Sequence, residues 1–211
     1  MAKVNGTDYS DEQKLIAKLI AKDDRAFCEI IKRFQHTMMI VARAITGDTF
    51  ADDVVQDAWE AVYKNIAKFE QRSSLKTWVM TIVSNEAKAR FRRESRKISL
   101  DELDGVIPGS YLDNANFGKD GHRLLPTPSW RSESPEELLE EQQLQRCITK
   151  TLNTLPPAQK AAFMLRDIEQ QSFEDICEIL QVSSANVRVL VHRARLTLLQ
   201  VIDRFQETGT C

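Results

Sequence analysis

The sequence has few of the residues from which metal centres and disulfide frameworks are built. Its 211 residues include three histidines and four cysteines, and no two cysteines form a C-x-x-C pair. Widely spaced cysteines without a neighbouring histidine do not make a metal set, so no metal and no cofactor is expected. Because free cysteine is usually buried, Cys28, Cys147 and Cys177 are predicted to be small core residues.

Long apolar runs and catalytic motifs are also lacking. No stretch reaches the roughly 18 unbroken apolar residues of a membrane span, and the first residues, MAKVNGTDYSDEQK, lack the apolar core of a signal peptide. A Gly-rich phosphate loop and a G-x-S-x-G motif are absent from the sequence as well. The chain is therefore predicted to be a cytoplasmic protein with no stable membrane insertion. The sequence offers few catalytic motifs, and an active site built from residues distant in the sequence is the alternative left open.

What the sequence does have is helical periodicity. Apolar residues recur three and four positions apart from the N-terminus to about residue 95, and no strand pattern competes. Asp23 or Asp24 starts one such run, Gly47 ends it, and Ser74 starts another. On the segment 48–69, the stripe predicted to be buried comprises Val54, Val55, Ala58, Trp59, Val62, Tyr63 and Ile66.

The periodicity fails between residues 98 and 133. Four of the six prolines and four of the seven glycines lie in or beside this segment, and residues 99–143 carry ten acidic against three basic residues. An acidic linker of this length predicts two helical domains, over 1–97 and 134–211, separated by a flexible linker over 98–133. Trp130 in the linker is either an anchor for a partner or a side chain that packs on a neighbouring domain.

The second helical block contains a helix-turn-helix pattern. The segments 172–180 and 184–205 are joined by the short turn Gln-Val-Ser, and Ser183 is the predicted cap of the second helix. The opposite face of that helix offers side chains that bind base edges and phosphates in a major groove. These are Asn186, Arg188, His192, Arg193 and Arg195; an ordinary amphipathic helix with solvated arginines is the alternative.

Two charged clusters lie in the first block. Residues 85–97 carry six Lys or Arg against two Glu, and cations stacked four apart, such as Lys88, Arg92 and Arg96, repel one another unless an anion such as a phosphate backbone neutralises them. The alternative is a solvated helix end favoured by the helix dipole. An acidic ridge of Asp52, Asp53, Gln56, Asp57 and Glu60 is either a favourable helix start or a docking surface for a basic partner protein.

Three stretches together resemble a known family. DDVVQDAWEAVYKNIAKF, then SSLKTWVMTIVSNEAKARFRR, and finally LNTLPPAQKAAFMLRDIEQQSFEDICEILQVSSANVRVLVHRARLTL are similar to regions 2 and 4 of the extracytoplasmic-function group of sigma-70 factors. The resemblance covers both helical blocks in the expected order. It implies an all-α fold in which region 2 and region 4 domains are joined by a linker.

The resemblance also implies partners and site residues. Core RNA polymerase would be bound through its β′ clamp helices by Asp52, Asp53, Gln56 and Asp57, and through its β flap by region 4. The −10 element of promoter DNA would be held by Phe69, Arg72, Ser73, Asn85, Lys88, Arg92 and Arg93. The −35 element would be read by Ser184, Asn186, Arg188, His192, Arg193 and Arg195. Trp78 matches a family tryptophan, but it lies on the apolar face and is predicted to be a core residue rather than a base-stacking one.

The sequence therefore favours an alternative sigma factor that has no enzymatic activity of its own, gives core polymerase its promoter choice and is held inactive by an anti-sigma protein. A dimeric helix-turn-helix repressor or activator is the main rival, and it leaves the acidic ridge and the first basic helix without a role. A DNA-processing enzyme would require a metal cluster that the sequence does not offer.

Overall fold

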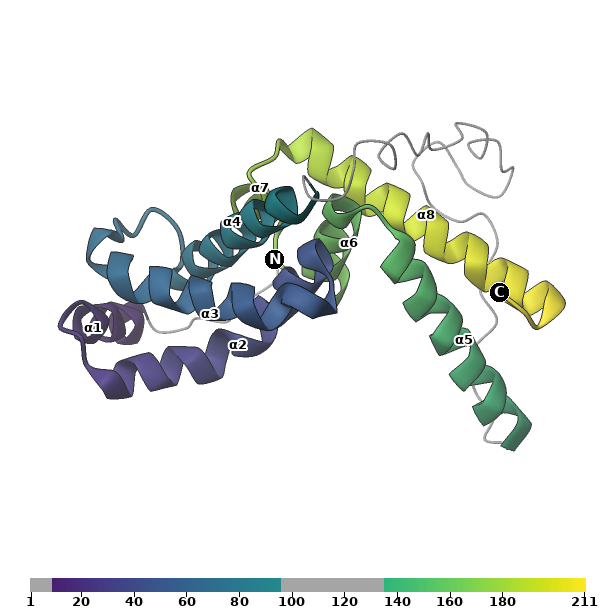
Figure 1. Ribbon diagram of the computed structural model, residues 1–211, viewed down its shortest axis with the longest axis horizontal. Helices are drawn as coiled ribbons and strands as arrows, with labels where there is room; N and C mark the ends of the chain where they lie inside the picture. The colour runs from purple at the N-terminus through teal and green to yellow at the C-terminus, as the bar shows by residue number, and fades with distance from the viewer. Residues whose placement is uncertain (1–8, 96–134) are drawn as a thin grey trace. The chain divides into compact units, whose positions relative to one another are not determined.

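The structure is a computed structural model that describes residues 9–95 and 135–211 (Figure 1). The predicted linker over 98–133, Trp130, Arg96 and Lys97 lie outside the described residues. Within the described residues the secondary structure is helical and contains no strand, which confirms the predicted all-α class.

The first block contains α1 (Tyr9–Ile20), α2 (Asp24–Thr46), α3 (Asp48–Asn65), the 3-10 turn η1 (Ile66–Lys68) and α4 (Leu75–Ser95). The second contains α5 (Pro135–Thr154), α6 (Pro157–Phe163), η3 (Met164–Ile168), α7 (Phe173–Leu180) and α8 (Ser184–Thr208). The segment η3 has the wider π-helical hydrogen-bond pattern rather than continuing as a regular α-helix.

The predicted helix boundaries follow from capping side chains. The Asp23 carboxylate accepts hydrogen bonds from the backbone N–H groups of Arg25 and Ala26 at 2.8 and 3.1 Å, which satisfies two of the free donors at the start of α2. Gly47 ends α2 with a φ of +76°, where a residue with a Cβ would be strained. Ser74 accepts from the N–H of Thr77 at 3.0 Å at the start of α4.

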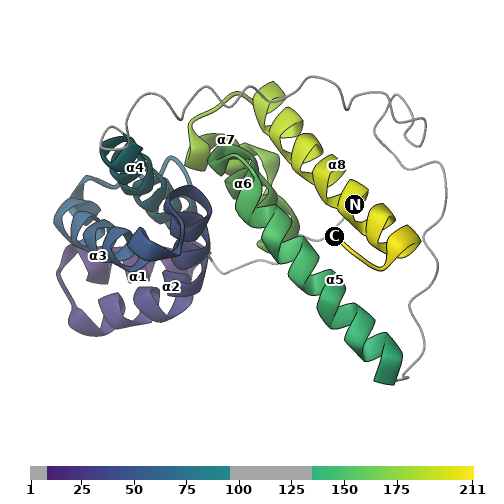
Figure 2. The ribbon, with the colours of Figure 1, turned by 45° about the vertical axis from the view of Figure 1, so that its right-hand side comes forward.

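The described residues form two compact units. The first unit comprises 9–93 and 156–191, and the second comprises 94–95, 135–155 and 192–211. In the first unit, α1 to α4 gather into one bundle (Figure 2), and α2 packs against α1, α3 and α6. One continuous apolar core runs from Leu15 on α1 through this bundle to Val191 on α8.

The second unit has a much smaller core. Its buried cluster consists of Leu144 and Cys147 on α5 and Phe205 on α8, with Ile148, Val201 and Ile202 packed against it. Cys147 is also bonded to Cys211 as a disulfide. The prediction that Cys147 is a buried residue is therefore confirmed, but the prediction that it is a free thiol is wrong.

Two other predicted core residues, Cys28 and Tyr63, are exposed. Cys28 lies on the surface of α2, whereas Cys177 on α7 is half-buried and packs against the main core. Tyr63 is 44% exposed because it lies at the edge of the bundle, where Phe27 covers its ring at 4.8 Å and the Lys22 ammonium lies 3.8 Å from its centroid. The predicted stripe is nevertheless buried at Val62 and again at Ile66, so Tyr63 is the member that lies at its exposed border.

Among the described residues, no helix is both long and apolar enough to cross a bilayer. The same part of the chain contains no group of three His, Cys, Asp or Glu side chains that could hold a metal ion.

Candidate nucleic-acid and protein interfaces

The acidic ridge lies on the outer face of α3. Asp52, Asp53, Gln56 and Asp57 are all exposed. The opposite face of the same helix, with Ala51, Val54, Val55 and Ala58, is buried in the core. Burial fixes the rotation of the helix about its axis, so the four polar side chains are held together on the surface.

Basic side chains border this ridge. Arg90 on α4 reaches to 3.8 Å from the Asp53 carboxylate and stacks on the Phe50 ring at 4.5 Å. Further along α3, Lys64 pairs with Glu60 at 2.8 Å, and this contact lowers the pKa of Glu60 and raises that of Lys64. The charge of Glu60 is therefore balanced by a lysine of its own helix.

The first of the residues predicted to bind the −10 element, Phe69, belongs to the core. Its ring is 7% exposed and packs against Trp78 at 5.0 Å with a tilt of 40°. Trp78 itself is packed against the main apolar core, as predicted. The two rings fix the base of the loop that leads from η1 to α4, so Phe69 can position this loop rather than expose its own ring.

The remaining residues predicted at the −10 element fall into an exposed and a covered group. Arg72, Asn85, Arg92 and Arg93 are exposed, and Ser73 is half-buried. Arg72 pairs with Glu70 at 2.5 Å, and both side chains are open to solvent. An exposed ion pair of this kind costs little to break, so Arg72 can exchange its partner for a phosphate.

Lys88 is covered by the helix-turn-helix. Its ammonium donates a hydrogen bond to the backbone carbonyl of Leu180, the last residue of α7, at 2.7 Å. Burial lowers the pKa of Lys88, and the nearby charge of Arg92 lowers it further. Lys88 therefore satisfies a helix-end carbonyl in this structure instead of facing solvent.

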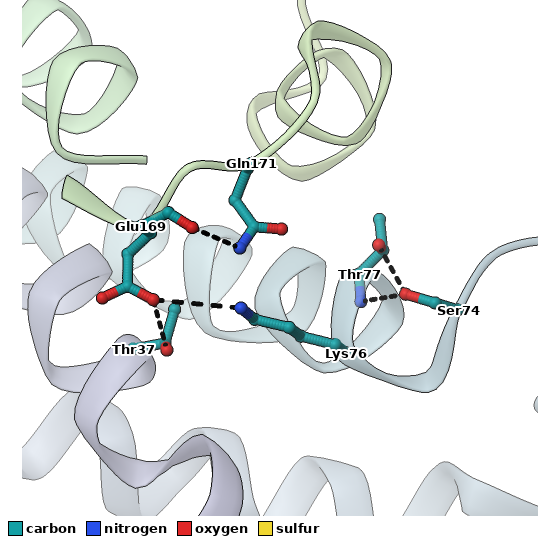
Figure 3. A network of polar contacts seen from close by, with 6 residues as sticks. All are labelled: Thr37, Ser74, Lys76, Thr77, Glu169 and Gln171. Atoms are coloured by element: carbon teal, nitrogen blue, oxygen red, sulfur yellow. Dashed lines mark hydrogen bonds and ion pairs between the residues drawn. The ribbon is translucent and has the colours of Figure 1, made fainter. Parts of the chain in front are cut away.

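A polar network joins segments that are far apart in the sequence (Figure 3). The Glu169 carboxylate, after η3, accepts a hydrogen bond from Thr37 on α2 at 2.7 Å and lies 3.9 Å from the Lys76 ammonium on α4. Nearby, the Thr77 hydroxyl donates to Asp175 on α7 at 2.8 Å. Sequence analysis missed these residues, because no local pattern links positions separated by as many as 132 residues.

The helix-turn-helix forms as predicted. Ser172 caps α7 by accepting from the N–H of Asp175 at 3.0 Å, and Gln181 takes the left-handed conformation, with a φ of +54°, that ends it. Ser183 accepts from the N–H of Asn186 at 3.3 Å. The inward residues of the two helices, Ile176, Ile179, Leu180, Val187 and Val191, are buried.

All six residues predicted to read the −35 element are exposed on α8. They are Ser184, Asn186, Arg188, His192, Arg193 and Arg195. The guanidinium group of Arg188 lies 5.7 Å from the centroid of the Phe173 ring, which also packs against Arg166 at 4.4 Å. Stacking on an aromatic ring restricts the rotamers of Arg188 while its N–H donors remain available.

These features are those of a helical protein that carries a helix-turn-helix with an exposed cationic face and a separate acidic ridge. Comparison with protein families narrows the class. Residues 30–97 match the family description "Sigma-70 region 2", and residues 145–198 match "Sigma-70, region 4". The chain belongs to the extracytoplasmic-function group of the sigma-70 family, whose members are transcription initiation factors.

Relatives of known name agree with this assignment. The chain is 29% identical over 154 residues to a "Probable RNA polymerase sigma factor" of Haemophilus influenzae, covering 73% of this chain and 77% of that protein. It is 26% identical over 185 residues to the RNA polymerase sigma-H factor of Pseudomonas aeruginosa, covering 87% and 90%. It is 28% identical over 186 residues to the ECF RNA polymerase sigma-E factor of Escherichia coli K12, with the same coverage of 87% and 90%.

Two solved structures share the fold. CnrH, solved in complex with the cytosolic domain of CnrY, matches with a TM-score of 0.57 and 21% identity over 92% of this chain and 97% of CnrH. The sigma factor RpoE of Bartonella quintana, solved with the anti-sigma factor NepR, matches with a TM-score of 0.56 and 22% identity over 84% of this chain and 96% of RpoE.

Proposed function

We propose that this alternative sigma factor binds core RNA polymerase in the cytoplasm and directs initiation at promoters with separate −10 and −35 elements. It supplies binding surfaces and no enzymatic activity of its own. The domains follow the sequence boundaries, with region 2 over 1–97, an acidic linker over 98–133 and region 4 over 134–211. The observation that carries the proposal is the exposed acidic ridge on α3, in a chain that also presents an exposed cationic helix-turn-helix.

The ridge is the polymerase-docking surface. Asp52, Asp53, Gln56 and Asp57 offer carboxylates and an amide on a rigid helix, which suits the basic β′ clamp helices that the family binds. Arg90 restrains Asp53 by an ion pair and packs on Phe50, so this part of the ridge is held in place before the partner arrives. Preorganised side chains lose less conformational entropy on binding.

The −10 element meets the surface formed by the η1–α4 loop and the second half of α4. Arg92, Arg93 and Arg72 supply charge for the phosphates of the unpaired strand, and Asn85 and Ser73 supply hydrogen bonds. Phe69 positions the loop by packing on Trp78. Lys88 joins this surface when its bond to the Leu180 carbonyl is exchanged for a phosphate contact.

The −35 element meets α8. Ser184, Asn186 and Arg188 lie at its N-terminal end, where a recognition helix contacts base edges in the major groove. The later cations, His192, Arg193 and Arg195, are placed for phosphates, which fix the orientation of the helix on the duplex. Other surfaces of region 4 bind the β flap.

Each of the two DNA contacts has a modest affinity by itself, and the polymerase allows both to form at once. When the enzyme fixes the separation of the two domains, binding at one element raises the effective concentration of the other domain at its own element. An anti-sigma protein controls the factor by occupying the surfaces that polymerase needs. The two solved relatives that share this fold support this step, because one was solved with the anti-sigma factor NepR and the other with the cytosolic domain of CnrY.

The test is transcription in vitro. Purified protein is mixed with bacterial core RNA polymerase on a fragmented library of the source genome, and the 5′ ends of the transcripts are sequenced. We expect new starts that share two upstream motifs at a fixed spacing and disappear when the protein is left out. Specific duplex binding by the protein alone, with no new starts, would replace this proposal with a repressor.

A further inference from the structure

The second compact unit contains a pair of bonded cysteines that the proposed function does not use. Cys147 on α5 and Cys211 at the last position of the sequence are 64 residues apart, and they are joined as a disulfide with a Cα–Cα distance of 5.6 Å. This distance lies in the ordinary range for a disulfide. The other two cysteines, Cys28 and Cys177, are free.

The two cysteines are positioned in different ways. Cys147 is 3% exposed on the inward face of α5, where it packs with Leu144 and Phe205. Cys211 is exposed and reaches Cys147 because the chain turns after α8. Gly209 makes this turn with a φ of +67°, and its N–H donates to the Phe205 carbonyl at 2.8 Å.

Hydrogen bonds of the Thr208 side chain stabilise this turn. The Thr208 hydroxyl donates to the Arg204 carbonyl at 2.8 Å and accepts from the N–H of Thr210 at 3.3 Å. Arg204 is a residue of α8 and Thr210 lies beyond its end, so the Thr208 side chain links the helix to the residues that follow it. Cys211 thus follows α8 by a short, hydrogen-bonded segment.

The apolar contact between α5 and the end of α8 is small, so the disulfide contributes a large share of what holds these two segments together. The buried cluster there consists of Leu144, Cys147 and Phe205, with three half-buried residues around it. A cluster of this size excludes little water and contributes correspondingly little free energy. The covalent link holds α5 to the end of α8 independently of that cluster.

We propose that Cys147 and Cys211 form a reversible dithiol–disulfide site that exchanges with low-molecular-weight thiols and disulfides of the glutathione class. The exposed sulfur of Cys211 is the point of entry, and the buried sulfur of Cys147 is the resolving partner. The bond ties α5 to the end of α8 when it is closed and releases them when it is open. The proposal depends on the proposed cytoplasmic location only for reversibility in the cell, because thiol pools there reduce exposed disulfides.

The exchange balances in two steps. In oxidation, the Cys211 thiolate attacks a small disulfide RSSR, forms the mixed disulfide of Cys211 with RS, and releases one RS⁻. The Cys147 thiolate then attacks the Cys211 sulfur of the mixed disulfide, forms the intramolecular bond and releases the second RS⁻. Two protein thiols are oxidised, one RSSR is reduced to two thiols, and the two protons pass to the solvent or to the released thiolates.

The test uses the full-length protein with Cys28→Ser and Cys177→Ser in the background, so that every thiol counted belongs to the pair. The protein is equilibrated in glutathione buffers from fully reduced to fully oxidised, and free thiols are alkylated under denaturing conditions and counted by intact mass spectrometry. We expect two alkylated thiols at the reduced end and none at the oxidised end, with monomer mass throughout. Two alkylated thiols at every ratio, or a disulfide-linked dimer, would overturn the proposal.

Single variants test the order of the steps. With Cys147→Ala in the same background, oxidised glutathione should add the mass of one glutathione to Cys211, because the resolving thiol is missing. With Cys211→Ser, no glutathione should be added at native conditions, because Cys147 is buried. Glutathione on Cys147 but not on Cys211 would contradict the assigned entry point. Amide exchange at the C-terminal end of α8 should be at least several-fold slower in the oxidised protein than in the reduced one, and redox-independent in Cys211→Ser.

Discussion

The two compact units differ in the contacts that stabilise each of them internally. The first unit has a continuous apolar core drawn from α1, α2, α3, α4, α6, α7 and the start of α8. The second unit joins α5 to the end of α8 through the cluster of Leu144, Cys147 and Phe205 and through the Cys147–Cys211 disulfide. Where many helices pack together, the burial of apolar surface is large enough to stabilise the unit by itself. Where only two helices meet, less apolar surface is buried, so a covalent or polar contact contributes a larger share of the stability.

The first prediction compares one kind of substitution in both units. Leu165, in η3 of the first unit, is fully buried, and Leu144, in α5 of the second, is 7% exposed. Leu165→Ala should lower the free energy of unfolding by about 2–5 kcal/mol, because the dense core around it cannot collapse into the cavity. Leu144→Ala should cost less, since a two-helix contact relaxes more easily. Urea denaturation followed by circular dichroism gives both values, and equal losses would mean that the two cores are equally constrained.

The second prediction removes the covalent contact. Reduction of the Cys147–Cys211 bond should lower the stability of the second unit by about 2–4 kcal/mol, because the unfolded chain regains the freedom of a long loop. Hydrogen exchange on oxidised and reduced protein should show faster exchange in α5 and the end of α8, with α2 and α3 unchanged as the internal control. Equal acceleration in α2 would show that the two units do not respond separately.

The third prediction concerns the polar network of the first unit. Glu169→Lys removes the acceptor of the Thr37 hydroxyl and places a second cation beside Lys76, so a loss of about 1.5–3 kcal/mol is expected. The double variant Lys76→Glu with Glu169→Lys should recover part of this loss. Glu29→Lys is the matched control, because Glu29 forms an exposed i,i+4 pair with Arg33 and should change stability by less than about 0.5 kcal/mol. No recovery in the double variant would show that the Lys76 contact contributes nothing measurable.

The fourth prediction separates function from stability on the surface of the first unit. Gln56→Lys places a cation in the acidic ridge, where Asp52 and Asp53 lie one helical turn before it and Asp57 follows it directly. Its folding stability should change by less than about 0.5 kcal/mol, since Gln56 is exposed. Affinity for core RNA polymerase should fall at least tenfold because like charges would meet in the complex, about 1.4 kcal/mol. Fluorescence titration with labelled protein gives the affinity, with Glu29→Lys again as control; unchanged affinity would remove the ridge from the docking surface.

The smallest expected effect is the pH dependence at Lys88. Burial lowers its pKa in the folded protein, so the unfolded chain binds more protons between that lowered pKa and the ordinary Lys value of 10.5. Folding stability contributed by this group should therefore rise with pH through that window and be independent of pH below it, where Lys88 is protonated in both states. The stability difference between wild type and Lys88→Met, measured by urea denaturation from pH 8 to 10.5, should shift in favour of wild type as the pH rises. A difference independent of pH would mean that the Lys88 ammonium is as well solvated as in the unfolded chain.

Local signals in the sequence were sufficient for most of the fold. Asp23, Gly47 and Ser74 mark helix ends because capping depends on residues within four positions of one another. Val187 and Val191 follow the same helical period, which places the cationic face of α8 outward. The prediction for Tyr63 was wrong because the same period cannot tell how far the neighbouring helices extend over a stripe.

For the candidate surfaces, too, the sequence predicted some features and not others. Exposure of Asp53, Gln56 and Asp57 followed from the buried face of their helix. The burial of Phe69 and the bond between Lys88 and the Leu180 carbonyl did not follow, because both depend on the packing of segments that are distant in the sequence. The roles of these residues at polymerase and promoter stay predictions that the experiments above address.

The sequence by itself determined the helices, their ends, the faces they bury and the family to which the chain belongs, because each of these depends on the order of neighbouring residues. Tertiary structure alone decided which distant side chains meet. Thr37 with Glu169, Lys88 with Leu180, and Cys147 with Cys211 are pairs that helix packing and a C-terminal turn bring together. No local pattern encodes such pairs, because they depend on how helices distant in the sequence pack against each other. That packing forms only when the whole core closes and offsets the conformational entropy that the segments lose.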